Sequence, residues 1–294
     1  MIFEGVYTAI ITPFQDQGRS VDYGAYRELI ERQAASGAAG VVPCGTTGES
    51  PTLSHQEHQE LIARTVEYVN GRMKVIAGAG SNSTSEAEKL TIAACKDGAD
   101  AVMLVNPYYN KPSQEGLYRH FKTVAEASSA PVVLYNIKGR TAVNTEPETL
   151  SRLADIENIQ AVKEASGDLG QMVRIKKLCG SRLTILSGDD NIIPAVMGIG
   201  GRGVISVASN LFPTKMTRMM HHYLQGDFAA GNEIFYELTD LMNALFWDTN
   251  PVPVKAAMHL MKHCGGDLRL PLVAMAPEKV AAMKKIIDGL GADD

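Results

Sequence analysis

The sequence predicts an α/β fold, a (β/α)8 TIM barrel with a C-terminal helical extension. Short runs rich in β-branched residues alternate with longer stretches of helical periodicity, the pattern of repeated βα units around a parallel sheet. Eight such units can be distinguished, and only helical patterns follow Leu211. An open doubly wound sheet is the alternative, but eight regular units followed by a helical tail favour a closed barrel.

The strands and helices can be placed from these patterns. The eight strands are expected to begin near Val6, Gly40, Met73, Ala101, Pro131, Ile159, Thr184 and Gly203. Helices are expected over residues 22–35, 54–70, 83–96, 114–127 and 146–154, and in the tail over 213–224, 227–246, 253–262 and 277–288. Ser54 followed by Glu57 has the form of a capping box. We therefore predict a catalytic barrel over residues 1–211 and a helical extension over 212–294 packed on it.

Composition excludes several classes of protein. A formal net charge of -5 with scattered basic residues argues against a nucleic-acid partner. Cys44, Cys95, Cys179 and Cys264 form no C-x-x-C pair, which predicts neither a zinc site nor a disulfide framework and fits a reducing compartment. The chain shows no secretory signal pattern and no apolar run long enough to span a membrane. The expectation is a cytoplasmic protein with no membrane partner.

The carboxyl ends of the strands carry the chemistry, because active sites of such barrels lie there. Lys163 closes the apolar run 159–162, which would place its amine inside the barrel mouth. Burial disfavours the ammonium form, so a free amine would be available to attack a carbonyl and form a Schiff base. A strand-end lysine that reaches solvent, or one paired with Glu164, is an equally open interpretation.

Other polar residues follow neighbouring strands. Tyr135 ends the preceding strand and could shuttle a proton, although an interior tyrosine with a satisfied hydroxyl is the commoner case. Thr46 and Thr47 lie in a glycine-bounded turn that could hold a small carboxylate, or could be an ordinary loop. Arg140 could bind a second carboxylate in a bidentate manner, or form a surface salt bridge.

Three motifs are interpreted as structural. The G-x-G-x-x-G match at 198–203 leads into a strand rather than a helix, so it predicts a close approach to the eighth strand. His55 and His58 lack the spacing of a zinc-protease helix, and no metal is expected. Asp189 and Asp190 are interpreted as helix caps.

Several motifs in order resemble one known family. They are Gly45-Thr46-Thr47-Gly48-Glu49, Tyr108-Tyr109-Asn110, Tyr135-Asn136 with Arg140, and Val162-Lys163-Glu164. Together they resemble the dihydrodipicolinate synthase family, and the resemblance runs from 5–9 to 250–255. It implies a homotetramer, a dimer of dimers, that needs no cofactor. It also implies the condensation of pyruvate with L-aspartate 4-semialdehyde during lysine and diaminopimelate synthesis.

The resemblance implies roles for eight residues. The catalytic residues would be Lys163, which forms the imine with pyruvate, and the proton relay of Tyr135, Thr46 and Tyr109, with Tyr109 supplied across a subunit interface. The substrate-binding residues would be Thr47, Gly188 and the backbone at Ile205 for pyruvate, and Arg140 for the carboxylate of the aldehyde.

The wider superfamily leaves the second substrate open. It includes N-acetylneuraminate lyase and other pyruvate lyases, which share the imine lysine. Sialic-acid lyases typically carry Ser-Thr in place of Thr46-Thr47 and lack an arginine matching Arg140, so both features favour the synthase. Lys138 departs from the proline of many synthases. From another class of protein, a non-catalytic barrel that binds a small carboxylate would not need Lys163 and Tyr135 together.

A regulatory site is also implied by the resemblance. The positions that bind feedback inhibitor L-lysine in sensitive synthases match Ser50, His55, His58, Asn82, Glu86 and Tyr108. Glu86 would take the ammonium of the ligand. Without the resemblance, His55 and His58 would be interpreted as solvated residues of an exposed first helical turn. Inhibition by L-lysine is the resulting prediction.

Overall fold

A computed structural model describes residues 3–293. Its main sheet is a closed barrel of parallel strands. The barrel strands are β1 (Gly5–Thr8), β4 (Gly40–Val41), β5 (Lys74–Gly78), β6 (Ala101–Val105), β7 (Val132–Asn136), β8 (Ile159–Glu164), β9 (Thr184–Ser187) and β10 (Gly203–Ser206). Each begins within one residue of its predicted start.

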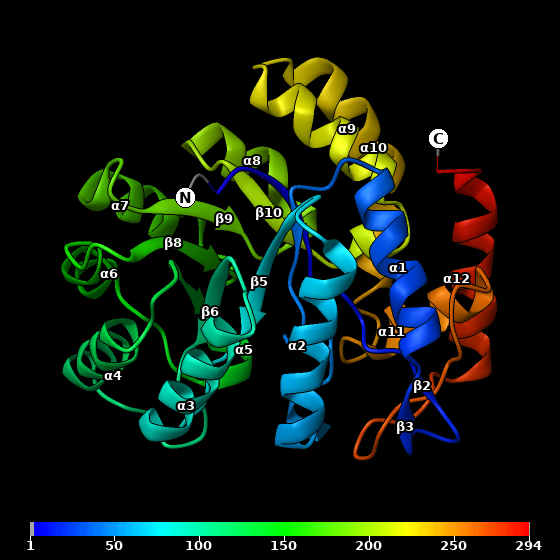
Figure 1. Cartoon of the computed structure of the whole chain (residues 1–294). Coiled ribbons are helices and arrows are strands. Elements are labelled where there is room, and N and C mark those ends of the chain that lie inside the picture. The colour runs from blue at the N-terminus through cyan, green and yellow to red at the C-terminus, as the bar shows by residue number, and fades with distance from the viewer. Residues whose placement is uncertain (1–2, 294) are drawn as a thin grey trace.

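The ring closes between the first and last strands of the chain. β1 pairs with β4 on one side and with β10 on the other, Val6 lying opposite Val204. The closed (β/α)8 barrel is therefore confirmed and the open sheet excluded (Figure 1). The glycine motif before β10 also behaves as predicted, because a Cβ on Gly203 would lie 2.3 Å from the carbonyl oxygen of Gly5.

Helices cover the outside of the barrel. They are α1 (Tyr23–Ala35), α2 (His55–Val69), α3 (Thr84–Lys96), α4 (Gln114–Glu126), α5 (Lys138–Thr141), α6 (Pro147–Leu153), α7 (Leu169–Cys179) and α8 (Ile193–Ile199). The capping box of Ser54 and Glu57 is present at the start of α2. The sequence patterns did not predict α5, α7, α8 or the short hairpin of β2 (Phe14–Gln15) and β3 (Ser20–Val21).

The apolar core has two layers, because side chains alternate between the two faces of each strand. On β7, Val133 and Tyr135 belong to the layer inside the barrel, whereas Val132 and Leu134 face the helices. On β8 the same alternation puts Ala161 inside. The interior layer is thus closed below by apolar residues and polar only toward the carboxyl ends of the strands.

The chain after β10 forms helices only. They are α9 (Pro213–Leu224), α10 (Phe228–Ala244), α11 (Val252–Leu260) and α12 (Pro277–Leu290), and they gather along one side of the barrel in Figure 1. α9 packs against β1 and α10, and α11 contacts the 3-10 turn η3 (Ala208–Asn210) after β10. Asp293 accepts hydrogen bonds from the backbone N–H groups of Thr214 and Lys215, so the last described residue caps α9.

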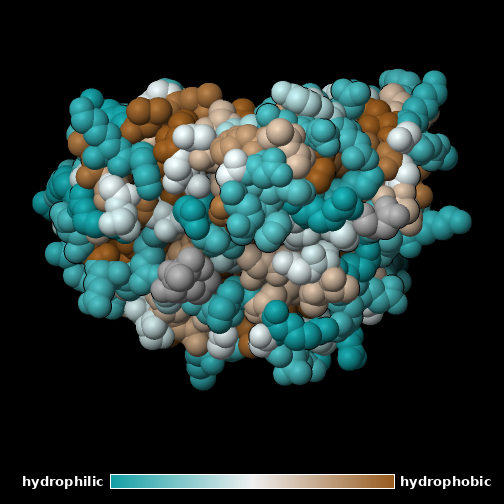
Figure 2. All heavy atoms as spheres, turned by 90° about the horizontal axis from the view of Figure 1, so that it is seen from above, coloured by the Kyte–Doolittle hydropathy of each residue, from teal (hydrophilic) through white to brown (hydrophobic). Residues whose placement is uncertain are grey.

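The surface is mixed in character. Figure 2 shows hydrophilic residues over most of one face, with hydrophobic residues interspersed among them. Within residues 3–293, no helix combines the length and the apolar character needed to cross a membrane.

Candidate active site

Lys163 and Tyr135 lie side by side inside the barrel. They are paired in register on the neighbouring strands β8 and β7. Both side chains are buried, and the Lys163 Nζ lies 4.2 Å from the centroid of the Tyr135 ring. This contact is a cation–π geometry when the amine is charged, and it holds the amine against the tyrosine in either form. The structure therefore puts the predicted nucleophile and its predicted proton-transfer partner next to each other.

Glu164 does not pair with Lys163, because adjacent residues on a strand face opposite ways. Its buried carboxylate accepts hydrogen bonds from Asn136 Nδ2 at 3.0 Å and from the Ser166 N–H at 2.9 Å. Burial raises the pKa of this carboxyl, and these bonds oppose that rise. The alternative of a Lys163–Glu164 ion pair is wrong.

The ends of β9 and β10 supply the next part of the site. Gly188 follows β9 so closely against Ala165 that a Cβ on it would lie 2.5 Å from the Ala165 Cβ. Ile205 is fully buried in the interior layer on β10. Gly188 thus follows the strand next to β8 and its Lys163, and Ile205 lies one strand further around the barrel.

The interpretation of Asp190 as a helix cap is wrong. Asp190 lies within the 3-10 turn η2 (Asp190–Ile192), and its Oδ2 accepts hydrogen bonds from the N–H groups of Val207 and Ala208, both at 2.9 Å. Asp189 precedes η2 but makes no side-chain capping bond. Burial raises the pKa of both carboxyls, and the positive charge of Lys163 lowers it. Asp190 thus ties β9 to the segment after β10, a contact that sequence order does not reveal.

Thr46 and Thr47 occupy a tight turn after β4. The Glu49 N–H donates to the Thr46 carbonyl at 3.1 Å, which closes the turn. Thr47 is buried, and its Oγ1 accepts a hydrogen bond from Asn250 Nδ2 at 2.9 Å. Because the Thr47 hydroxyl accepts in that bond, its own hydrogen is available to a ligand.

Arg140 reaches over the barrel mouth from α5. One guanidinium nitrogen, Nη2, donates to the Asn250 carbonyl at 3.0 Å. No described carboxylate forms an ion pair with it, so the surface salt bridge is not what the structure contains. Lys138 is the first residue of α5 and is exposed, so the position accepts a charged side chain.

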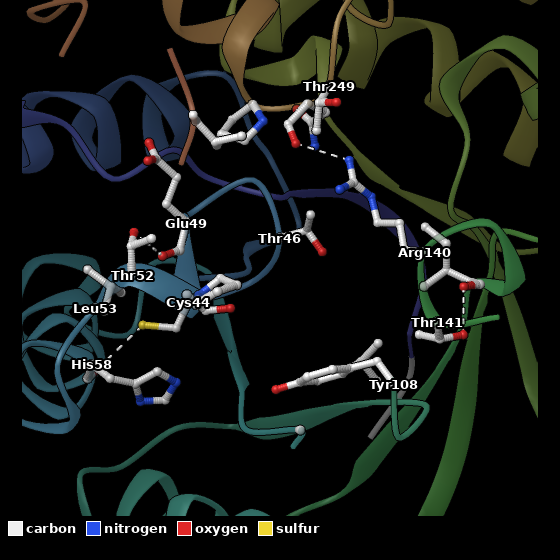
Figure 3. A pocket seen from close by; sticks show the side chains of 18 of the residues that line it. Cys44, Thr46, Glu49, Thr52, Leu53, His58, Tyr108, Arg140, Thr141 and Thr249 are labelled. Atoms are coloured by element: carbon white, nitrogen blue, oxygen red, sulfur yellow. Dashed lines mark hydrogen bonds between the residues drawn. The ribbon is translucent and has the colours of Figure 1, made fainter. Parts of the chain in front are cut away.

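A cavity of about 440 Å³ lies over these residues (Figure 3). Thr46, Arg140 and Asn250 are among the residues that line it. Figure 3 shows the Arg140 side chain directed toward the segment that carries Thr249. Among the described residues, the lining does not include Lys163 or Tyr135, which lie within the barrel. The cavity is therefore formed by residues other than the Lys163–Tyr135 pair.

The residues predicted to bind L-lysine line the same cavity. They are Ser50, His55, His58, Glu86 and Tyr108. Asn82 lies beside them and donates from Nδ2 to the Tyr108 carbonyl at 3.1 Å. Figure 3 shows the Tyr108 hydroxyl directed toward His58 across the space. The structure thus gathers all six residues, which come from three successive segments between barrel strands, after β4, β5 and β6.

Charge is concentrated at Glu86. Its carboxylate bonds to Ser81 Oγ and to His55 Nε2, the latter at 2.9 Å. These bonds, led by that of Ser81, lower the pKa of Glu86 and keep it ionised. His55 is exposed as expected, but His58 is buried, and its burial lowers its pKa. A purely solvated pair of histidines is therefore wrong for His58.

Tyr109 is directed away from the site of its own chain. It is 90% exposed, has a positive φ of 74°, and is not on the described lining of the cavity. This tyrosine is thus exposed in a backbone conformation that bulky residues rarely adopt.

The sequence did not predict the contacts of three residues of this region, namely Asn250, Lys255 and Glu49. Asn250 joins Thr47 to Arg140, and the buried Lys255 forms an ion pair with Glu49 at 2.6 Å. All three lay in motifs that supported the resemblance, but no spacing rule connects positions about 200 residues apart. Only an unexpected lysine in the apolar pattern of α11 could have served as a signal.

The described residues contain no group of three or more His, Cys, Asp or Glu side chains that could hold a metal ion. The chemistry that the geometry offers is instead an enclosed lysine amine, a tyrosine hydroxyl beside it, and hydroxyl and guanidinium donors above. Fold and site together define a (β/α)8-barrel enzyme. The chain belongs to the dihydrodipicolinate synthetase family, whose model matches residues 2–290.

Relatives cover the chain almost completely. It is 53% identical over 287 residues to the 4-hydroxy-tetrahydrodipicolinate synthase of Leptospira biflexa, covering 97% of each chain. It is 48% identical over 291 residues to the protein of the same name from Syntrophobacter fumaroxidans, covering 99% of each.

Solved structures agree with this. Dihydrodipicolinate synthase from Aquifex aeolicus is 44% identical with a TM-score of 0.95, covering 97% of each chain. The Acinetobacter baumannii synthase complexed with pyruvate is 38% identical, and that of Cyanidioschyzon merolae with lysine bound is 40% identical. Both give a TM-score of 0.95 and cover 98% of each chain.

Proposed function

We propose that this chain is a 4-hydroxy-tetrahydrodipicolinate synthase, which condenses pyruvate with L-aspartate 4-semialdehyde in lysine and diaminopimelate biosynthesis. The observation that carries the proposal is the buried Lys163 paired in register with Tyr135 inside the barrel. Relatives of that name, at 45–53% identity over nearly the whole chain, support the choice of reaction.

The proposed reaction begins at the Lys163 amine. It attacks the keto carbon of pyruvate, water leaves, and an imine remains. Loss of a methyl proton gives an enamine, whose carbon attacks the aldehyde carbon of the second substrate. The amino group of that substrate then replaces Lys163 at the imine carbon, closes the ring and frees the lysine.

The other site residues have roles in proton transfer and binding. Tyr135, with Thr46 and a Tyr109 from a neighbouring subunit, would move protons between these intermediates. Thr47, Gly188 and the backbone at Ile205 would hold pyruvate. Arg140 would bind the carboxylate of the aldehyde, since only one of its nitrogens is engaged by Asn250.

The alternative hypothesis is a pyruvate lyase acting on a sugar acid. Two measurements in sequence separate it from the synthase. The protein is incubated with pyruvate, reduced with borohydride and weighed, which tests for an imine on Lys163. Turnover is then measured with aspartate semialdehyde and, separately, with N-acetylmannosamine. We expect an adduct and turnover of the first aldehyde only. A folded protein that forms no adduct would exclude both enzymes and favour a carboxylate-binding barrel.

We also propose that L-lysine inhibits the enzyme at the Glu86 side of the cavity. Glu86 stays ionised, and it lies with His55, His58 and Tyr108 around one space, which suits an amino acid with a second ammonium group. A related synthase solved with lysine bound supports this.

The inhibition has a direct test. We expect E86Q to raise the half-inhibitory lysine concentration about tenfold or more, measured relative to its own uninhibited rate, because a charge-assisted hydrogen bond is lost. E88Q, on the same helix but outside the cavity lining, serves as the control. A rate that does not change up to millimolar lysine would disprove the regulation.

We also propose how the subunits assemble and where the enzyme acts. A homotetramer built as a dimer of dimers would cover the exposed Tyr109 and Leu270 and bring Tyr109 to a neighbouring site. Native mass spectrometry measures the number of subunits directly. The free thiols of all four cysteines suit the reducing cytoplasm, where we propose that the enzyme acts.

A further inference from the structure

A cluster of buried charges joins the barrel mouth to the C-terminal extension. We call it the Glu49 cluster, and it comprises Phe14, Glu49, Lys255 and Arg269. Lys255 Nζ lies 2.6 Å from Glu49 Oε1, with side-chain exposures of 0% and 1%. The Arg269 N–H donates to Glu49 Oε2 at 3.2 Å, so both carboxylate oxygens are engaged by the extension, one from α11 and one from the loop after α11.

Two cationic side chains contact the Phe14 ring. The Lys255 Nζ lies 4.1 Å and the Arg269 Cζ 4.3 Å from its centroid. Such contacts are strongest when water is excluded, as it is at Phe14, which is 1% exposed. Arg269 extends the cluster to α2 through a two-nitrogen contact with Glu57, the closer at 2.6 Å.

Glu49 is also part of the turn that carries Thr46 and Thr47. Its N–H closes the turn on the Thr46 carbonyl, and its own backbone is left-handed with a φ of 54°. A non-glycine residue adopts this conformation only where its surroundings hold it. The surroundings here are the Lys255 ion pair and the Arg269 backbone, while Asn250 Nδ2 bonds to Thr47 from just before α11.

A buried ion pair contributes little net stability, because removing two charges from water costs about as much as their attraction returns. Apolar residues of similar volume would hold α11 on the barrel at least as well. What they would not provide is a directed, short contact to one carboxylate in a strained turn. The cluster is therefore better suited to fixing the position of the turn than to joining the two parts.

We propose that Lys255 is a positioning residue which, through Glu49, fixes the turn of Thr46 and Thr47 in the geometry that binds pyruvate. This inference rests on the proposed function, in which Thr46 and Thr47 act on pyruvate. It makes the C-terminal extension part of the active-site machinery, although Lys255 itself touches no substrate.

The test measures the pyruvate concentration that gives half-maximal borohydride trapping on Lys163. K255M keeps the length of the side chain and removes its charge. We expect the half-saturating concentration to rise about tenfold or more, because small misplacements of binding groups are costly. The double variant K255M/E49Q should recover thermal stability relative to K255M, since no unpaired charge stays buried, but should not recover pyruvate binding.

K215M is the matched control. Lys215 is also a largely buried lysine of the extension, with an ion pair to Glu237 at 2.6 Å and an aromatic ring, that of Phe212, beside it. It makes no described contact with the turn, so K215M should lose stability and keep the wild-type half-saturation. If K255M does not fold, E49Q, which removes a charge but hardly any volume, decides the question by the same measurement.

The outcomes are distinct. Half-saturation within twofold of wild type in folded K255M or E49Q overturns the inference, and so does an equal rise in K215M. Both results leave the proposed function intact, because the wild type still traps pyruvate. A wild type that traps none overturns the proposed function and this inference together.

Discussion

The two halves of the active site are held by different means. The Lys163–Tyr135 pair lies inside the barrel, where two neighbouring strands in register place it. The Thr46–Thr47 turn lies at the mouth and is held by side chains from Asn250 and Lys255, about 200 residues away in the chain. The first half is fixed by backbone hydrogen bonds that any sequence of the fold would make, whereas the second depends on a few specific side chains.

This difference teaches where the site is robust and where it can be altered. A side-chain change at the strands removes a reacting group but leaves the geometry, because the strand ladder does not depend on it. A change at the turn moves groups that stay present. The first kind should abolish chemical steps, and the second should weaken binding.

The largest effect is expected at the nucleophile. K163M replaces the amine with an apolar chain that the interior can accept, and it should lower turnover by roughly 10³-fold or more while the protein stays folded. Loss of the borohydride adduct, read by mass, should accompany it, with circular dichroism as the folding control. A K163M protein that still traps pyruvate would place the imine on another lysine.

Y135F tests the partner of Lys163 without disturbing its packing. The ring under the amine is retained and only the hydroxyl is lost, so the adduct should still form while turnover falls by about 100-fold. Y7F is the matched control, because Tyr7 is also buried inside the barrel but on β1. Equal losses in the two variants would mean that the loss in Y135F is not specific to proton transfer by the Tyr135 hydroxyl.

R140K tests the mouth of the cavity. The charge remains but the planar fork is lost, so kcat/KM for aspartate semialdehyde should fall about 10-fold to 100-fold, while the half-saturating pyruvate concentration changes little. Steady-state kinetics with each substrate varied in turn measures both. K138Q, in the same short helix, controls for loss of a nearby charge, and a matching fall there would count against a specific role for Arg140.

The smallest effect is expected at the contact between Arg269 of the extension and Glu57 of α2. Hydrogen bonds from Arg269 lower the pKa of Glu57 from 4.5 to about 2. Because the folded value lies below the unfolded one, this contact stabilises the protein above about pH 4.5 and the stabilisation is lost as pH falls toward 2. E57Q should therefore lower Tm by roughly 2–4 °C at pH 7, a modest amount because the pair is partly exposed to solvent.

The pH dependence provides the check. The difference in Tm between E57Q and the wild type should shrink as the pH is lowered from 5 toward 2, measured by calorimetry. E67Q, on the same helix with an exposed 3.4 Å contact to Arg64, should show little difference at any pH. A difference in Tm that stays constant down to low pH would contradict the role assigned to the Glu57 carboxylate.

The sequence by itself determined the barrel and the position of Lys163 at the end of one of its strands. Strand starts were predicted to within one residue because apolar, β-branched runs bounded by turns depend on local pattern alone. The alternation of side chains then put Lys163 at a strand end facing inward, next to Tyr135 if the strands were neighbours. The resemblance of the ordered motifs added the residues of the cavity, and the structure brings them together.

Tertiary structure alone decided what holds the mouth of the site. Asp190 was expected to cap a helix but binds the backbone after β10. His58, which without the resemblance would be interpreted as solvated, is buried. Asn250 and Lys255 gave no local sign of their partners Thr47 and Glu49. A periodic pattern reports which face of an element is apolar, but hydrogen bonds between side chains far apart in the chain exist only once the barrel has closed and the extension has packed on it.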